Sequence, residues 1–365
     1  MRFITPNYLK NFKCDGTLCN SYCCREWKIA VDEETKNKYE CLPIETREKV
    51  LKNLREKDGN YYPLKLKKDG LCPFLREDLL CDLQKNYGED YLSNVCYSYP
   101  RVTVKVSDTI FQSLTLSCPV AAELVLFAEN IFFEEKEVKN YRLGWHSDFE
   151  TRENLNNELL EDIVSAGLFI LKDNSISIEN RLKMLVDFYN KADSFNDNEK
   201  ELNELLDSIE NNKFQQKFME ENNNKIGSVI FNEKDFLPII FKLYNVLYEV
   251  NFDDKKISEL TKIYNENFDN FNENLIENNE GIFTNYLLNE FFMRLYPYAF
   301  NQKFSANIKT FILSWYALKF ALFMMYMKEG LDKENLIFCV RRVVERIDHG
   351  KGVVKKILDL AKEIE

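Results

Sequence analysis

Cysteine placement constrains this chain more than any other feature of its sequence. Four cysteines fall within the eleven residues CDGTLCNSYCC, from Cys14 to Cys24, and the last two are adjacent. Nine of the ten cysteines lie within the first 118 residues. A chain of 365 residues can bury a full core without disulfides, so crowded thiols in a reduced compartment indicate a metal site or catalysis. The first third of the chain is therefore expected to fold around its thiols.

The cysteine spacing predicts a metal site without naming the metal. It reads C-x4-C-x3-C-C, followed after a gap by four separate cysteines, and it matches neither the paired C-x-x-C knuckles of zinc ribbons nor a ferredoxin run. Eight thiolates would fill two tetrahedral four-thiolate sites. Cys41 and Cys339 are left out, and Cys339 is expected in a helical core. The predicted ligands are Cys14, Cys19, Cys23, Cys24, Cys72, Cys81, Cys96 and Cys118.

The adjacent pair Cys23 and Cys24 sets a geometric condition. Successive side chains of an extended segment point to opposite faces, so the two thiols would not reach one small ion without a tight turn. We expect them to serve two neighbouring sites, or one to be a ligand and the other to lie behind it. The negative charge of the thiolates could be offset by nearby arginines, namely Arg25, Arg76 and Arg101.

Cys118 has a distinctive position at the start of a predicted helix. It precedes Pro119 and the apolar segment VAAELVLFAE, and proline is common at the first helical position. Cys118 is therefore expected at the N-cap, where the positive end of the helix dipole favours a thiolate.

Charge and hydropathy exclude several partners. The formal net charge is −11, which argues against a nucleic acid or an anionic membrane surface. The first residues contain no apolar stretch of the length that a signal peptide needs, so a cytoplasmic location is expected. Residues 310–327 approach the length of a membrane span, but Lys319 lies in the middle, and we predict a buried core helix.

The expected fold class is α+β in two parts. Residues 1–130 are predicted to form a small cysteine-rich metal-binding module with short hairpins, and residues 150–365 a mainly α-helical domain. One hairpin is expected to join YYPLKL to LCPFL across the turn at 67–70, and another to join 102–106 to FQSLTLS. Asparagine-rich residues 265–281 are expected to be a joint between helices. Helices are predicted at 43–57, around LLCDLQKNY before Gly88, and at 155–172, 176–195, 233–249, 284–296, 307–328, 333–347 and 352–364.

Several common functional motifs are absent from the sequence. The chain has 11 glycines and no G-x-G-x-x-G, P-loop, G-x-S-x-G or H-E-x-x-H motif. The absence of G-x-G-x-x-G argues against a Rossmann-type nucleotide site. Two histidines exclude a histidine-rich metal site, and His349 is expected to cap the C-terminal end of a helix.

The motifs resemble a known family. The runs F-K-C-D-G-x-x-C-x-x-x-C-C-x-x-W, L-C-P-F-L-x-x-D-x-L-C, L-S-x-x-C-x-x-Y-P-R and S-L-x-L-S-C-P are similar to the flagellin lysine-N-methylase family, which is FliB-like. That family carries an eight-cysteine domain described as zinc- or iron-chelating. The segments at 285–297 and 342–349 are similar to two of its C-terminal helices, with an insertion before His349. The other matching residues are Trp27, Asp78, Tyr99, Pro100 and Arg101.

The resemblance implies an activity. It points to a methyltransferase that moves a methyl group from S-adenosylmethionine to lysine side chains of flagellin or another lysine-bearing protein. It also implies an iron–sulfur (4Fe–4S) centre, with zinc as the alternative. The residues of the helical half suggested for contact with the substrate are Asp348, Glu345, Arg342, Asn285 and Asn289.

Two other functions fit the same sequence. A structural zinc module could staple a helical protein-interaction domain without any catalysis, since zinc fills four-thiolate sites in that way. A metal-storage or redox module would change colour reversibly without methyl transfer. The identity of the metal separates these functions, and neither catalytic nor cofactor-binding residues are predicted from the sequence itself.

Overall fold

The chain contains both sheet and helix, and its contacts divide it into two compact units. The computed structural model describes residues 1–16, 19, 22–25, 27, 29–139, 141–144, 146–149, 157–195, 198–223, 237–300 and 303–363. Unit 1 comprises Met1–Leu124 and Phe132–Asp148, and unit 2 comprises Val125–Ile131 and Phe149–Glu365. The structure has a small sheet and a helical C-terminal region, which confirms the predicted mixture of strands and helices. The predicted domains 1–130 and 150–365 stay predictions.

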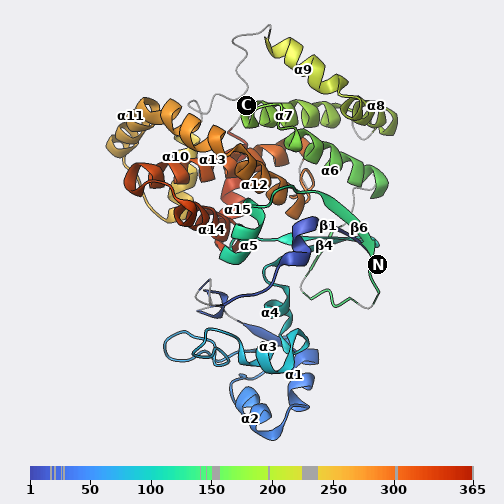
Figure 1. The fold of residues 1–365 in the computed structure, drawn as a ribbon, viewed down its shortest axis with the longest axis vertical. Coiled ribbons are helices and arrows are strands. Elements are labelled where there is room, and N and C mark those ends of the chain that lie inside the picture. The colour runs from blue at the N-terminus through green and yellow to red at the C-terminus, as the bar shows by residue number, and fades with distance from the viewer. Residues whose placement is uncertain are drawn as a thin grey trace. The chain divides into compact units, whose positions relative to one another are not determined.

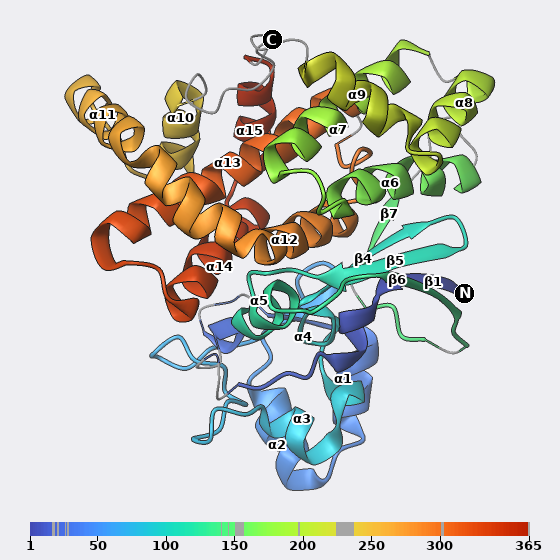
Figure 2. The ribbon, with the colours of Figure 1, turned by 45° about the horizontal axis from the view of Figure 1, so that its top comes forward.

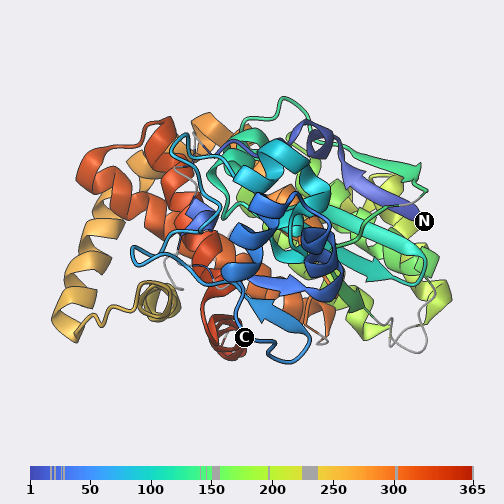
Figure 3. The ribbon, with the colours of Figure 1, turned by 90° about the horizontal axis from the view of Figure 1, so that it is seen from below.

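Unit 1 is built on a five-stranded sheet with the order β6-β1-β5-β4-β7. Its core is a mixed arrangement, because β1 pairs with β5 in parallel and with β6 in antiparallel fashion. In Figure 3 the N-terminal strand, dark blue and marked N, runs beside the teal strands of this sheet. The strands are β1 (Arg2–Pro6), β4 (Arg101–Val106), β5 (Thr109–Leu114), β6 (Phe133–Glu137) and β7 (Ser147–Phe149).

The β4–β5 hairpin confirms the prediction for this region. Its six residue pairs run from Arg101 opposite Leu114 to Val106 opposite Thr109, and the turn lies at Ser107. Ser107 has a φ of 51°, the left-handed conformation that a two-residue hairpin loop requires. Strands β1 and β6 were not predicted, because each joins the sheet through a pairing between distant parts of the sequence.

The remainder of unit 1 consists of short elements joined by loops. The predicted turn at 67–70 is confirmed, since the amide of Gly70 donates to the carbonyl of Lys67 over 3.0 Å. The predicted hairpin across it is wrong, because β3 pairs with β2. The elements are β2 (Ala30–Asp32), α1 (Glu33–Glu40), α2 (Ile44–Lys52), β3 (Tyr61–Pro63), α3 (Asp82–Tyr87), α4 (Asn94–Ser98) and α5 (Pro119–Leu126), whose last two residues belong to unit 2.

Local chemistry sets the ends of these short helices. The Asp32 carboxylate accepts a hydrogen bond of 2.9 Å from the amide of Thr35 and so caps α1. Gly88 ends α3 with a φ of 86°, as predicted, because an L side chain is disfavoured in that conformation. Helix α5 starts at Pro119, and the carbonyl of Cys118 accepts from the amide of Ala122 over 2.8 Å. The predicted start of this helix is confirmed.

Unit 2 is a bundle of helices around α13, which packs against α7, α10, α11, α14 and α15 (Figures 1 and 2). Residues 155–156, 233–236 and 364 of the predicted helices lie outside the described residues. The predicted joint at 265–281 is wrong, because that segment continues from α11 through a π-helix at Asn272–Ile276 into α12. The helices are α6 (Asn157–Lys172), α7 (Ile178–Ser194), α8 (Glu199–Glu210), α9 (Lys213–Asn223), α10 (Leu237–Tyr248), α11 (Asp254–Phe271), α12 (Glu280–Met293), α13 (Phe304–Glu329), α14 (Lys333–His349) and α15 (Val353–Ala361).

Helix α13 is the centre of the apolar core of unit 2. Among the described residues it is the one helix long and apolar enough to cross a membrane, and 78% of its most apolar window is buried inside the protein. Lys319, in its middle, is buried, with its ammonium 4.8 Å from the ring centroid of Phe268. Burial of this kind is what the core helix of a folded domain shows.

Candidate functional site

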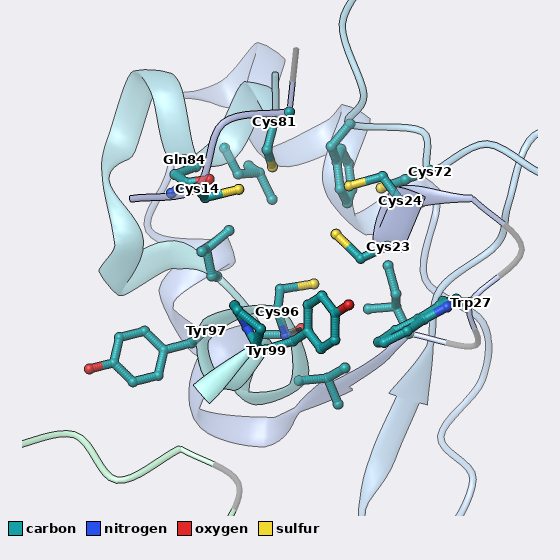
Figure 4. A pocket seen from close by; sticks show the side chains of 18 of the residues that line it. Cys14, Cys23, Cys24, Trp27, Cys72, Cys81, Gln84, Cys96, Tyr97 and Tyr99 are labelled. Atoms are coloured by element: carbon teal, nitrogen blue, oxygen red, sulfur yellow. Dashed lines mark hydrogen bonds between the residues drawn. The ribbon is translucent and has the colours of Figure 1, made fainter. Parts of the chain in front are cut away.

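One cavity of unit 1 is lined by all eight cysteines of the predicted ligand set. We call it the thiol cavity, and its volume is about 110 Å³. In Figure 4 the sulfur atoms of the six labelled cysteines are directed into a common space. Cys41 is exposed and Cys339 is buried in unit 2, and neither lines the cavity. The cysteines of the cavity are Cys14, Cys19, Cys23, Cys24, Cys72, Cys81, Cys96 and Cys118.

Short helices and loops far apart in the sequence deliver these cysteines. Cys81 and Cys118 each directly precede a helix, α3 and α5 respectively, and Cys96 lies on α4. The amide of Cys72 donates to the carbonyl of Cys24 over 2.9 Å, which ties the second cysteine run to the first. Tertiary contacts between these separate segments therefore hold the cavity together, with only short elements of regular secondary structure.

The adjacent pair Cys23 and Cys24 differs from the extended geometry that the sequence suggested. Both residues lie in a short 3-10 helix, Tyr22–Cys24, and both line the thiol cavity. The tight turn that the sequence set as the condition for both thiols to reach one ion is present, and whether they serve one site or two stays a prediction. A hydrogen bond between the two thiols raises the pKa of Cys23 and lowers the pKa of Cys24.

Burial holds most thiols of the cavity in the protonated form. It raises the pKa of Cys96 to about 12, and it also raises the pKa values of Cys72 and Cys81. Hydrogen bonds to the sulfurs oppose this effect: Cys72 accepts from the backbone of Phe74, and Cys96 from the Ser93 side chain. Hydrogen bonds of this kind stabilise thiolates and tune bound metal centres. A metal entering the cavity would therefore displace protons.

The donor set of the cavity fits a thiophilic metal. Cysteine sulfurs suit zinc and iron–sulfur clusters, and one water molecule needs roughly 10 to 15 Å³ of such space, so the cavity has room for more than a single small ion. Within the described part of the chain, no group of three or more His, Cys, Asp or Glu side chains is gathered closely enough to hold a metal ion. The ligand roles of the eight cysteines therefore stay a prediction.

The three arginines suggested for charge balance have different surroundings. Arg101 lines the thiol cavity, and Arg25 lies outside the lining but lowers the pKa of Cys24 by its charge. Arg76 does neither. Its guanidinium pairs with the carboxylates of Asp78, at 3.0 Å, and Asp82 on the exposed surface.

Aromatic side chains form much of the remaining wall. Trp27 and Tyr99, which belong to the sequence runs, meet edge to face with ring centroids 4.7 Å apart. Phe12, Tyr39 and Tyr97 also line the cavity and were not singled out from the sequence. Asp15 and Glu89, which carry carboxylates, are also among the lining residues. The cavity thus combines thiols, aromatic faces and carboxylates, a lining that suits cationic ligands.

The residues suggested in the helical half have mixed surroundings. Asn285 donates to the carbonyls of Leu126 and Ala128, at 3.1 and 2.8 Å, and fastens that segment to α12. Arg342 donates to Glu345 on the same face of α14 over 2.9 Å. His349 is the exposed last residue of α14, where a cation is favoured by the helix dipole.

Asp348 and Asn289 belong to a buried charge cluster of unit 2. The guanidinium of Arg294 pairs with Asp348 and with Glu290, the latter at 3.4 Å, and Asn289 donates to Glu290 over 3.5 Å. Burial raises the pKa of Glu290 to about 7. Glu290 and Arg294 were missed from the sequence, although two opposite charges four residues apart in the apolar run NYLLNEFFMRLYP are a usable signal.

Substitution of Glu290 by glutamine is expected to flatten the pH dependence of stability. The pKa of Glu290 is higher in the folded state than its ordinary value of 4.5, so the folded state binds the proton more tightly. Stability from this group therefore falls as pH rises from about 4.5 to about 7, by about 3 kcal/mol at full ionisation. Urea denaturation at pH 5 and pH 7.5 measures the difference. The exposed carboxylate of Glu179 offers the control E179Q, and an unchanged slope in E290Q would contradict the assignment.

A known protein family matches the helical half of the chain. Residues 166–365, more than half of the chain, match the model of the FliB lysine N-methylase C-terminal domain. No solved structure matches the chain significantly.

Curated relatives come from Salmonella. The chain is similar to the flagellar biosynthetic protein FliU of Salmonella muenchen, with 32% identity over 126 residues that make up 33% of this chain and 75% of the relative. It is also similar to the lysine-N-methylases of Salmonella typhimurium (strain LT2) and Salmonella choleraesuis (strain SC-B67), each 32% identical over 126 residues. The matched part covers 33% of this chain and 31% of each of these two methylases. The chain belongs to the FliB lysine N-methylase family.

Proposed function

We propose that this protein transfers a methyl group from S-adenosylmethionine to lysine side chains of a flagellin-type protein. The observation that carries the proposal is the match of residues 166–365 to the C-terminal domain of the family, whose name states lysine N-methylation. The flagellar relative supports a flagellar substrate. The acidic surface, with a formal net charge of −11, suits a lysine-rich segment and disfavours nucleic acid. We expect the reaction to take place in the cytoplasm.

The thiol cavity is the proposed metal centre of this enzyme. Its eight cysteines would hold an iron–sulfur cluster, with those not needed as ligands lying behind it. Such a cluster would supply redox chemistry to the site. The hydrogen bonds that Cys72 and Cys96 accept support the thiolate form that a cluster requires.

The cavity lining can also serve the methyl-transfer chemistry. A lysine amine attacks the methyl carbon of the sulfonium, the bond from sulfur to methyl breaks, and the electron pair stays on the thioether sulfur. The amine must first lose a proton, since its ordinary pKa is about 10.4. Asp15 and Glu89 are the carboxylates of the lining that could accept it, directly or through water. The faces of Trp27 and Tyr99 would attract the cationic sulfonium.

The test is metal content followed by methyl transfer. Protein purified without oxygen is assayed for iron, sulfide and zinc and by visible spectrum, then incubated with methyl-labelled S-adenosylmethionine and flagellin. We expect a brown protein and label on flagellin lysines. Flagellin with acetylated lysines serves as the matched substrate control. Iron-loaded protein that labels neither flagellin nor a lysine-rich peptide would sink the proposal.

A zinc-stapled interaction module is the second candidate, and one feature favours it. Much of the chain around the cavity is loop between short elements, joined in part by isolated bridges such as Arg25 to Leu71 and Leu75 to Cys81. Two four-thiolate zinc sites would fasten such loops without any chemistry. Stoichiometric zinc in a colourless protein that binds flagellin without methylating it would favour this function.

A further inference from the structure

Positive charge is scarce in the thiol cavity. Of the described residues that line it, Arg101 is the one with a cationic side chain, beside the two carboxylates and the eight thiols. A divalent metal bound by four thiolates leaves a net negative charge, because the thiolate charges exceed the charge of the metal. An anionic group entering this space meets no cationic side chain of the described lining other than Arg101, and a charge partner lowers the free energy of binding. Whatever anion the cavity accepts is therefore expected to bind there.

The fold holds the guanidinium of Arg101 in a defined position. Arg101 is the first residue of β4 and pairs with Leu114 of β5, so its backbone is fixed in the sheet. Its guanidinium carbon lies 5.4 Å from the ring centroid of Phe12 and 5.9 Å from that of Tyr97. One nitrogen donates to the carbonyl of Tyr97 over 3.2 Å. A half-buried arginine stacked in this way is well arranged to bind a carboxylate through two parallel hydrogen bonds.

A second arginine nearby shows the contrasting structural role. The guanidinium of Arg142 lies 4.5 Å from the same Tyr97 ring. It donates to the carbonyls of Glu89, Asp90 and Leu92 and to the side chain of Asn94, and it does not line the cavity. Arg142 therefore fastens a loop, whereas Arg101 belongs to the described lining of the cavity.

We propose that Arg101 binds the α-carboxylate of the methyl donor in the thiol cavity. This inference rests on the proposed function, which supplies a donor with a sulfonium, an ammonium and a carboxylate. The cationic groups suit the aromatic faces and carboxylates of the lining, and only the carboxylate needs a positive partner. Arg101 is thus a positioning residue, which fixes the amino acid end of the donor and with it the direction of the methyl group.

Ligand pairs that differ by one carboxylate test this assignment. The probes are S-adenosylhomocysteine, which keeps the carboxylate, and its decarboxylated analogue, measured by anaerobic equilibrium dialysis with the metal-loaded full chain. Wild-type protein is expected to bind the carboxylate form roughly 10- to 100-fold more tightly. Arg101→Gln should bring that ratio close to one, and Arg101→Lys should keep part of it. The control Arg25→Gln removes a charge near Cys24 outside the lining and should leave the ratio unchanged.

The outcomes separate this inference from the proposed function. Equal affinity of wild-type protein for both ligands overturns the role of Arg101 and leaves a methyl-donor site in place. If Arg101→Gln and Arg101→Lys both lose affinity for the two ligands to the same extent, with normal metal content and circular dichroism, the role is also overturned. Because lysine keeps the positive charge, that result points to a structural role of the guanidinium. If wild-type protein binds neither ligand, the cavity is no donor site, and the proposed function falls together with the inference.

Discussion

Replacement of Cys72 by serine is expected to strip the protein of its metal. Cys72 is 5% exposed, lines the thiol cavity, and its sulfur accepts a hydrogen bond from the backbone of Phe74. A serine oxygen fits the same space but is a poor ligand for thiophilic metals. Iron, sulfide and zinc per chain, measured beside the visible spectrum, should fall well below the wild-type values.

The same substitution should lower thermal stability strongly. Structural zinc sites contribute about 10–16 kcal/mol of apparent binding free energy in small domains, and the chain around this cavity has few other elements to hold it. We expect the transition of unit 1 to drop by roughly 10 °C or more. Wild-type protein treated with a strong chelator should unfold at the temperature of the variant, because both lack the same metal.

Two cysteines outside the cavity provide matched controls. Cys41 is exposed at the C-terminal end of α1, so Cys41→Ser should keep both metal and stability. Cys339 is buried in α14, so Cys339→Ala should lose a little stability and no metal. Cys72→Ser with full metal content, or metal loss in Cys41→Ser of equal size, would contradict the assignment of the cavity.

Local signals in the sequence predicted local structure well. Proline after Cys118 marked the start of α5, Gly88 marked the end of α3, and the alternation of Val102 to Val106 before a turn at Ser107 marked the β4–β5 hairpin. Each of these depends on the conformational preference of one or two residues. The cysteine set was likewise visible, since clustering of one residue type needs no knowledge of tertiary structure.

Features that depend on distant contacts were not predicted. Strand β3 pairs with β2 about thirty residues earlier, where the sequence suggested its immediate neighbour. The segment at 265–281 is helical although it is rich in asparagine, because Phe271, Leu275 and Ile276 are buried against the bundle and outweigh the weak propensity. The turn at Cys23 and Cys24 has no signature of its own. In each case the tertiary packing of the segment determined its structure.

Replacement of Arg181 by methionine is expected to destabilise unit 2 by about 3 kcal/mol. Arg181 on α7 is fully buried, and its guanidinium donates to the carbonyl of Leu171 over 2.5 Å and to the hydroxyl of Thr284 over 2.9 Å. It also pairs with Glu280 at the start of α12. One side chain therefore joins the end of α6, the first turn of α7 and the start of α12. Methionine keeps much of the buried stem and removes every donor.

The size of the effect follows from what the substitution leaves behind. The carbonyl of Leu171 and the hydroxyl of Thr284 stay buried without the guanidinium, and each such loss costs about 1–3 kcal/mol. The Glu280 side chain is 32% exposed, so water can solvate its charge in part, which places the total at the lower end of the range for broken buried pairs. Urea denaturation followed by far-ultraviolet circular dichroism measures the change, because unit 2 holds most of the helix.

A surface control and a double variant complete the argument. Lys183 lies on the same helix and pairs with exposed Glu179, so Lys183→Met should change stability by less than about 0.5 kcal/mol. In Arg181→Met with Glu280→Gln no unpaired carboxylate remains, and part of the loss should return, which the double-mutant cycle reports as a coupling energy. Equal losses in Arg181→Met and Lys183→Met would show that the buried hydrogen bonds of Arg181 contribute no more than an exposed ion pair, which contradicts the prediction.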